Sequence, residues 1–228
     1  DDAKVDQMVR IIQYLKTLPV KTISIPKVEA DDVIAYLSKS VITHPKDKSF
    51  IVSSDKDFLQ LVDENVVVYR PMEKEYYTPQ TVIDKYKLSP HNFILHKTLL
   101  GDNSDKIKGV KGLGEKGLLK KFPELIEKDM SWGDILNICE EKISEHLVYA
   151  RIIHGRDDLE KNYKIMDLSN PMLSKEDKIW LDEIVASDNL PYYPDQFVSM
   201  YNEDQIGGLI RNVEFWVKDC FNNLVIKK

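Results

Sequence analysis

The stretch LLGDNSDKIKGVKGLGEKGL, residues 99–118, organises the middle of this chain. Its first half places two carboxylates, Asp102 and Asp105, on a short loop that begins at Gly101. Its second half is a lysine-rich turn punctuated by four glycines, which are Gly109, Gly112, Gly114 and Gly117. Carboxylate oxygens are ligands for a hard divalent cation, and a glycine turn that opens a helix suits a phosphate group. The stretch therefore predicts a cation and a phosphate held close together, and cleavage of a nucleic-acid backbone is the leading chemistry that needs both.

Two further acidic clusters each follow a predicted strand. Residues 21–25 and 49–53 are rich in β-branched side chains, and both runs end just before acids that open a helical pattern. The second run, SFIVS, is expected to be a buried strand. In an open parallel sheet the ligand site lies beyond the carboxyl ends of the strands, so the two clusters are expected to converge. Stabilisation of a helix dipole and N-capping explain only some of these acids. The acids are Glu29, Asp31 and Asp32 in the first cluster and Asp55 and Asp57 in the second.

Composition predicts an ordinary globular protein. The 228 residues are 43% hydrophobic and 31% charged, and no apolar run is long enough to span a bilayer. The two cysteines, Cys139 and Cys220, are too few for a disulfide framework and lack the spacing of metal ligands, so we expect both to be reduced. We therefore expect a cytoplasmic protein with no membrane partner.

The charge of the chain is unevenly distributed. The net charge of -6 argues against a polyanionic partner, yet residues 106–121 contain six lysines and one acid, Glu115. A local basic face inside an acidic protein is typical of a nuclease that collects carboxylates for metal binding. A solvated lysine-rich helix face is the simpler explanation, and the glycine pattern favours the nuclease.

Hydrophobic periodicity predicts an α/β region followed by a helical one. We place the α/β region, with a mostly parallel sheet flanked by helices, at residues 1–100. The helical region spans residues 101–228 and begins with the glycine turn at residues 101–122. His96 lies on an apolar helix and is interpreted as a packed histidine rather than a ligand. Helices are expected at residues 4–18, 31–37, 58–62, 79–86, 90–100, 115–122, 123–128, 131–138, 143–156, 176–185 and 204–221, strands at residues 21–25, 49–53, 66–70 and 75–78, and an extended segment at residues 163–172.

Four motifs in this order resemble the flap endonuclease and 5′-nuclease family. They are VEADD at 28–32, SSDKDF at 53–58, LLGDNSDKIKGV at 99–110 and GVKGLGEKG at 109–117. The resemblance is greatest to the bacteriophage branch, which includes the RNase H of T-even phages, and it implies a PIN-like core. Family members carry a first strand, a second strand and a basic arch ahead of these motifs, so we expect this chain to lack roughly the N-terminal third of a family member.

The resemblance also assigns roles to residues. It implies metal ligation by Glu29, Asp31, Asp32, Asp55, Asp57, Asp102 and Asp105, with Asp31, Asp57 and Asp102 as the catalytic residues. The expected cofactor is a pair of Mg²⁺ ions, for which Mn²⁺ can substitute, with K⁺ at the glycine turn. That turn resembles a helix-two-turn-helix motif that holds a duplex backbone, and its expected DNA-binding residues are Lys108, Lys111, Gly112, Gly114, Lys116, Gly117 and Lys120.

The function predicted in this way is a metal-dependent 5′-to-3′ exonuclease and structure-specific flap endonuclease. Its expected substrates are branched or flapped duplex DNA and RNA/DNA hybrids, and its expected role is primer removal beside other replication proteins, as a monomer. Two alternatives stay open: a DNA-binding fragment that holds branched duplex without cutting it, and an RNA-directed nuclease of PIN-like architecture. The lysine-rich glycine turn argues against the second, because that architecture does not require one.

Overall fold

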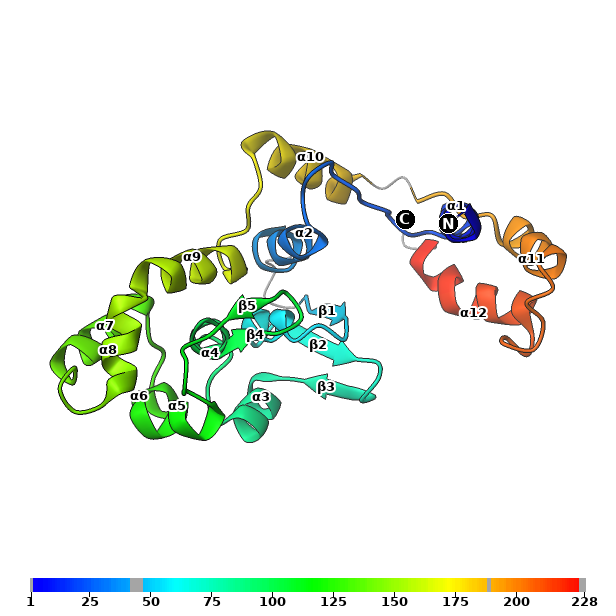
Figure 1. Cartoon of the computed structure of the whole chain (residues 1–228). Helices are drawn as coiled ribbons and strands as arrows, with labels where there is room; N and C mark the ends of the chain where they lie inside the picture. The colour runs from blue at the N-terminus through cyan, green and yellow to red at the C-terminus, as the bar shows by residue number, and fades with distance from the viewer. Residues whose placement is uncertain (1, 42–46, 188–189, 226–228) are drawn as a thin grey trace. The chain divides into compact units, whose positions relative to one another are not determined.

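The computed structural model describes residues 2–41, 47–187 and 190–225 (Figure 1). The chain forms two compact units, one made of residues 27–178 and the other of residues 1–26 and 179–228. The boundary at residue 178 falls inside helix α10 (Lys175–Ala186). The predicted boundary at residue 100 separates an α/β region from a helical region rather than two compact units, and it stays a prediction.

The unit of residues 27–178 is built on a three-stranded sheet in the order β1 (Ser49–Val52), β2 (Val66–Arg70) and β3 (Glu75–Tyr77). β1 and β2 are parallel, with Ser49 opposite Val66, whereas the two further predicted strands, β2 and β3, form an antiparallel hairpin. The α/β class is thereby confirmed. The parallel pair matters most for function, because both of its strands point their carboxyl ends toward the same edge of the sheet.

Helical segments surround this sheet. They are α2 (Ala30–Tyr36), the π-helical turn η1 (Leu37–Val41), the 3₁₀ helix η2 (Asp57–Leu61), α3 (Pro79–Tyr86) and α4 (Phe93–Leu100). α3 begins as its sequence predicts, with the Thr78 hydroxyl accepting a hydrogen bond from the Thr81 amide at 3.4 Å and Pro79 in the first turn. α4 is mostly buried and ends at Gly101, where the chain enters the acidic loop.

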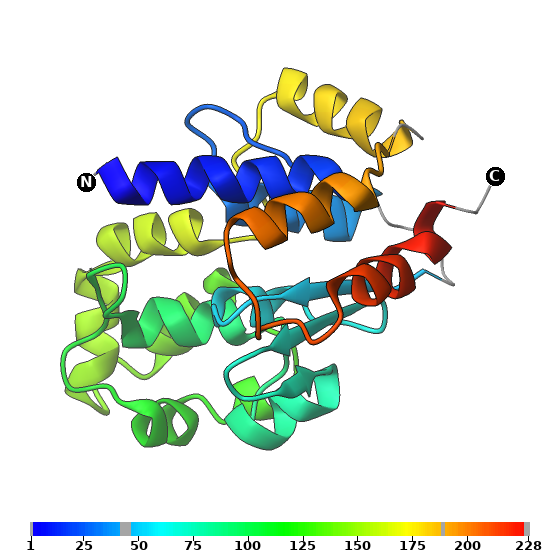
Figure 2. The same ribbon diagram turned by 90° about the vertical axis from the view of Figure 1, so that its right-hand side faces the viewer.

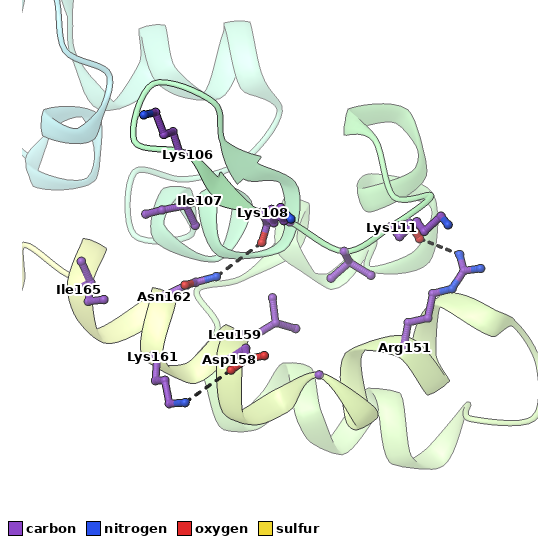
Figure 3. Close-up of a pocket in the computed structure, with 13 residues that line it drawn as sticks. Lys106, Ile107, Lys108, Lys111, Arg151, Asp158, Leu159, Lys161, Asn162 and Ile165 are labelled. Carbon is purple, nitrogen blue, oxygen red and sulfur yellow. Dashed lines mark hydrogen bonds and ion pairs between the residues drawn. The ribbon is translucent and has the colours of Figure 1, made fainter.

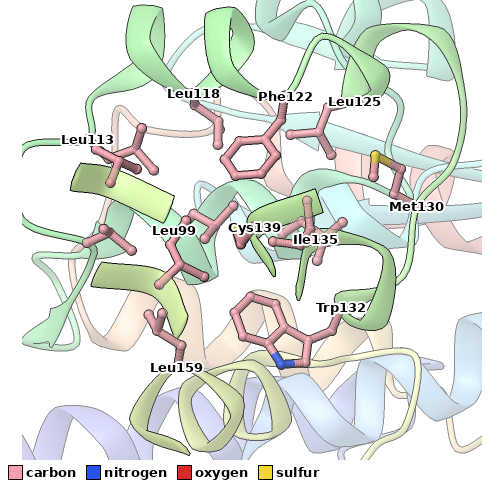
Figure 4. Packing of buried hydrophobic residues seen from close by; sticks show 14 of the residues in the cluster. Leu99, Leu113, Leu118, Phe122, Leu125, Met130, Trp132, Ile135, Cys139 and Leu159 are labelled. Atoms are coloured by element: carbon pink, nitrogen blue, oxygen red, sulfur yellow. The ribbon is translucent and has the colours of Figure 1, made fainter. Parts of the chain in front are cut away.

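A short hairpin and five helices follow α4. The hairpin pairs β4 (Gly101–Asp102) with β5 (Ile107–Lys108). Leu99, Leu118, Phe122, Ile135 and Cys139 are fully buried in the core that this region shares with α4 (Figure 4). Because α4 belongs to both this core and the sheet's surroundings, the acidic loop is held between two packed regions. The helices are α5 (Glu115–Lys121), α6 (Glu124–Glu127), α7 (Trp132–Glu141), α8 (Leu147–His154) and α9 (Arg156–Met166).

The second unit is built from the two terminal segments of the chain. Figure 2 shows α1 (Asp2–Thr17) in blue, α11 (Pro194–Glu203) in orange and α12 (Val213–Val225) in red. Its core contains Leu18, Phe197, Tyr201 and Val217. On its surface Arg10 binds the carboxylate of Asp204 through two nitrogens, at 2.7 and 2.8 Å. In the part of the chain that the structure describes, no helix is long and apolar enough to cross a membrane.

Two of the predicted extended segments are wrong. Residues 21–25 form no strand; instead, the Lys21 ammonium donates to the carbonyls of Val185 and Ser187, at 2.8 and 2.5 Å, at the end of α10. Residues 163–166 are the last turn of α9, because Leu159 and Met166 lie seven residues apart on one helical face and are both buried.

Two other predictions need correction. The helix expected at residues 204–221 begins only at Val213, as α12, because residues 204–212 form a turn after α11, in which Gly208 has a φ of 105°. The strand at residues 49–53 was expected to be buried, yet the side chains of β1 alternate, and Phe50 and Val52 are 59% and 66% exposed. Alternation of this kind marks a sheet with one face packed and the other open to solvent.

Candidate metal centre

The predicted carboxylates converge on one place in the structure. A cavity of about 430 Å³ is lined by six of the seven, namely Glu29, Asp31, Asp32, Asp55, Asp57 and Asp105. The seventh, Asp102, lines an adjacent cavity of about 670 Å³ together with Asp55, Asp57 and Asp105. These residues come from the start of α2, the loop after β1 and the β4–β5 loop. The first two clusters converge as expected, but the strand-end argument holds only for the second, because residues 21–25 form no strand; the third cluster joins them.

Asp57, Asp102 and Asp105 form the tightest group. Each offers one carboxylate oxygen, and these oxygens all lie within 4.8 Å of one another. Asp57 is buried at the start of η2, Asp102 is half-buried on β4, and Asp105 is exposed in the loop. Three oxygen donors at this separation fit the ligand chemistry of Mg²⁺, which prefers carboxylates and keeps several waters.

The carboxylates around Asp31 carry excess negative charge. The pKa of Asp31 is raised above its usual value, first by burial and then by repulsion from Asp55, Glu29, Asp32 and Asp105. Asp31 is therefore surrounded by carboxylates on both sides of the cavity. A divalent cation bound there would relieve this repulsion, so the donor set and its charge both fit a metal.

A lysine that sequence reasoning missed lies inside the carboxylate group. Lys97, on α4, is only 6% exposed, and its ammonium pairs with Asp57 and with Asp102, the latter at 2.6 Å. The hydrogen bond from Lys97 is the main reason that the pKa of Asp102 lies below its usual value. The signal was present in the sequence: a lysine in the apolar helix FILHKTLL has to find a buried anionic partner.

Several of the carboxylates also accept a hydrogen bond from a backbone amide through one oxygen. Asp55 accepts from the Asp57 amide at 2.9 Å and Asp102 from the Ser104 amide at 2.7 Å, so both loops are fixed by short local turns. Asp32 is buried and accepts from the Met172 amide at 2.8 Å. Asp32 therefore fastens the segment after α9 to the start of α2, a structural role in addition to the predicted one.

Two glycines form the neck of the acidic loop. Gly101 has a φ of 81°, and a Cβ there would lie 2.3 Å from the Gly109 amide nitrogen. A Cβ on Gly109 would lie 2.1 Å from the carbonyl carbon of Leu100. These two positions therefore exclude any side chain, which explains why glycine flanks the hairpin that carries Asp102 and Asp105.

The predicted DNA-binding residues are distributed over two places. Lys108 and Lys111 line a cavity of about 740 Å³ beside α8 and α9, shown in Figure 3. The other five lie outside that lining, at the turn before α5 and on α5 itself, where Lys116 and Lys120 are exposed. These five are Gly112, Gly114, Lys116, Gly117 and Lys120. Arg151, Lys161 and Asn162, which the sequence did not single out, complete the wall of the cavity.

His96 is packed, as the sequence suggested. Its ring stacks on Phe93 with the centroids 5.4 Å apart, and burial lowers its pKa. A neutral, stacked imidazole is consistent with a packing role at the edge of the Asp102 cavity.

The fold is that of solved 5′-nuclease structures. The bacteriophage T5 D15 flap endonuclease, solved in complex with DNA and metal ions, has a TM-score of 0.56 and 22% sequence identity to this chain. The likeness covers 79% of this chain and 62% of the T5 protein. At this identity the comparison concerns the fold alone.

The sequence is similar to 5′-3′ exonucleases and to bacterial DNA polymerase I. Residues 1–87 match the model described as 5′-3′ exonuclease, N-terminal resolvase-like domain. A 5′-3′ exonuclease of Aquifex aeolicus is 36% identical over 175 residues, 73% of this chain and 55% of that protein. The thermostable DNA polymerase I of Thermus thermophilus is 33% identical over 157 residues, 64% of this chain and 18% of that protein. The chain thus spans about half the length of the first relative and a smaller part of the second.

Proposed function

We propose that this chain is a member of the 5′-3′ exonuclease and flap endonuclease family and hydrolyses phosphodiester bonds with the help of divalent metal ions. The observation that carries the proposal is the convergence of seven carboxylates from three segments, with oxygens of Asp57, Asp102 and Asp105 within 4.8 Å of one another. Exonucleases of this kind among the sequence relatives support the reaction class.

The residues of the centre divide the work between them. Asp31, Asp57 and Asp102 would hold a pair of Mg²⁺ ions, with Glu29, Asp32, Asp55 and Asp105 as further ligands, direct or through water. Bound there, Mg²⁺ would supply a nucleophilic hydroxide and neutralise the leaving oxygen. The Lys97 ammonium orients the carboxylates of Asp57 and Asp102. Its positive charge also limits the repulsion between these two carboxylates.

The basic residues supply binding without reading sequence. Lys116 and Lys120 lie on α5, and the exposed glycines Gly112 and Gly114 lie in the turn before it. Lysine ammoniums and backbone amides contact phosphates of any sequence, so binding is expected to follow the shape of the substrate. The T5 flap endonuclease complex with DNA supports DNA as the partner.

The finer assignments belong to the same proposal. We propose flapped or branched DNA and RNA/DNA hybrids as substrates and primer removal during replication as the role, which the DNA polymerase I relative supports. The identity of the metal as Mg²⁺, K⁺ at the glycine turn, the monomeric state, the likeness to the phage branch, and the cytoplasmic location stay predictions.

The test is cleavage of a duplex with a 5′ flap. With Mg²⁺ present, the full chain should release products from the 5′-labelled strand, Mn²⁺ should substitute, and EDTA should abolish the reaction. A single-stranded RNA and an RNA duplex serve as comparison substrates. Cutting of the RNA substrates with the flap untouched would favour the RNA-directed alternative, and tight flap binding without cutting would favour the non-catalytic one.

A further inference from the structure

A groove separate from the carboxylate cavity lies between two segments distant in the sequence. One wall is the segment Lys106 to Lys111, and the other is the facing side of α8 and α9 (Figure 3). The groove has a volume of about 740 Å³. Lys108 and Lys111 on the first wall are predicted DNA-binding residues of the glycine turn. The opposite wall contains no residue of the four family motifs.

The charges around this groove favour an anionic occupant. Its lining contains five cationic side chains and one carboxylate, Asp158. Asp158 lies 3.5 Å from Lys161, with both side chains more than 70% exposed, so this ion pair is weak and open to exchange. The cations are Lys106, Lys108, Lys111, Arg151 and Lys161.

The groove has an apolar floor. Val110 and Leu159 are buried members of the central core and form part of the lining. A cationic rim above an apolar floor matches a sugar–phosphate backbone, whose phosphates are charged and whose sugars present C–H groups. A free inorganic anion would leave the apolar floor without a partner.

The two walls are fastened to each other through backbone carbonyls. Arg151 donates from Nη1 to the carbonyl of Lys111 at 2.7 Å, and Asn162 donates from Nδ2 to the carbonyl of Lys108 at 3.5 Å. Figure 3 shows both bonds crossing from the helices to the lysine segment. The groove is therefore a fixed feature of the fold, and Arg151 has a structural duty besides its charge.

The groove borders the acidic cavity, since Ile107 and Ile165 line both of them. A strand held at the carboxylates would pass these two side chains to reach the groove.

We propose that the groove binds the sugar–phosphate backbone of one nucleic-acid strand where that strand leaves the acidic cavity. Lys161 and Lys108 contact its phosphates from opposite walls, and the apolar floor lies under its sugars. The inference rests on the proposed function, because the other end of the strand lies at the carboxylate centre. It adds the α9 wall, with Lys161, to the surface that binds the substrate.

The experiment compares Lys161→Gln with Lys164→Gln. Both lysines lie on α9 and are more than 70% exposed, but Lys164 pairs with Glu160 and does not line the groove. Affinity for the 5′-flap duplex is measured in EDTA as a function of salt, so that cutting does not interfere. Lys161→Gln should weaken binding by about threefold to tenfold at low salt and reduce the salt slope by roughly one contact, and Lys164→Gln should change neither.

A second measurement identifies the contacted phosphate. Methylphosphonate linkages, which are uncharged, replace single phosphates in turn near the flap junction. At one or two positions the loss caused by Lys161→Gln and by the neutral linkage should be less than additive, because both remove the same contact. Additive losses at every position on both strands, or equal effects of the two lysine variants, would overturn the proposal.

The design separates the two proposals. If the wild-type chain fails to bind or cut the flap duplex, the proposed function is wrong, and the groove proposal that rests on it is wrong as well. If the wild type binds and cuts while Lys161→Gln behaves like wild type at every linkage, only the groove assignment is wrong.

Discussion

The Nζ atom of Lys97 lies 2.6 Å from Oδ2 of Asp102 and also pairs with Asp57, so one buried ammonium joins the loop after β1 to the β4–β5 hairpin. We predict that Lys97→Met lowers the free energy of unfolding by about 3 kcal/mol in metal-free buffer, because it leaves two nearly buried carboxylates without a counter-charge. Added Mg²⁺ should restore part of the loss in the variant. Urea unfolding with and without Mg²⁺ measures both effects.

The control is Lys56→Met, which changes an exposed lysine at the same cavity and should lower the free energy of unfolding only slightly. Equal stability of Lys97→Met and wild type would contradict a stabilising role for this ammonium.

The glycine neck leads to a structural prediction. Gly109→Ala should lower the free energy of unfolding by about 3 kcal/mol, since its Cβ would lie 2.1 Å from a backbone atom of Leu100 that cannot move alone. The matched control is Gly114→Ala in the same turn, where a Cβ meets nothing within 4 Å and the cost should be at most about 1 kcal/mol. Thermal unfolding compares the two variants, and a Gly109→Ala protein as stable as Gly114→Ala would mean that the hairpin neck is looser than described.

Sequence reasoning succeeded where the signal was local and failed where the partner was distant. The strands at residues 66–70 and 75–78 and the helix starts near residues 79 and 131 follow from residues within a few positions of one another. The pairing of Lys97 with Asp57 could not be predicted in this way, because it depends on how α4 packs against η2.

The same reason explains the errors. The segment Lys21 to Ile25 has β-prone side chains, but a strand needs a backbone partner, and no strand in the described part of the chain pairs with this segment. The second wall of the groove contains Arg151 and Asn162. Along the sequence it is more than 40 residues away from most of the segment 106–111, to which it is hydrogen-bonded. Only the tertiary structure brings these residues together.

Binding by the glycine turn should depend on salt. Lys116→Ala removes an exposed ammonium next to the turn and should weaken binding on any sequence, while reducing the salt slope by roughly one contact. The control is Lys74→Ala, an exposed lysine in the β2–β3 turn. Fluorescence anisotropy with labelled duplexes of two unrelated sequences measures both properties. An unchanged slope, or a loss confined to one sequence, would count against a phosphate contact.

The unit that joins the chain ends should lose stability in acid. The pKa of Asp204 is held below its usual value, first by the hydrogen bond from Arg10 and then by that from Tyr14. Because the folded pKa is lower than the unfolded one, the stabilisation is present above the ordinary Asp pKa of about 4 and is lost as pH falls through the folded value.

Asp204→Asn tests this pH dependence. The variant should be less stable than wild type from pH 5 to pH 7, and the difference should shrink as the pH is lowered below about 4. Asp219→Asn, an exposed change on α12, is the control and should follow the wild-type profile. Unfolding followed by circular dichroism at each pH gives the comparison. A difference that stays constant down to pH 2 would exclude titration of Asp204 as its cause.

The most direct test of the central claim measures cutting and binding in the same variant. Asp102→Asn removes one of the three clustered carboxylates while keeping its shape, and Asp84→Asn, an exposed change on α3, serves as the control. On a 5′-flap duplex with Mg²⁺, we predict that Asp102→Asn abolishes cleavage while its affinity for the flap, measured in EDTA, stays close to that of wild type and Asp84→Asn. Cleavage at the wild-type rate by Asp102→Asn, or a parallel loss of cleavage and binding, would contradict the assignment of this carboxylate cluster as the metal centre.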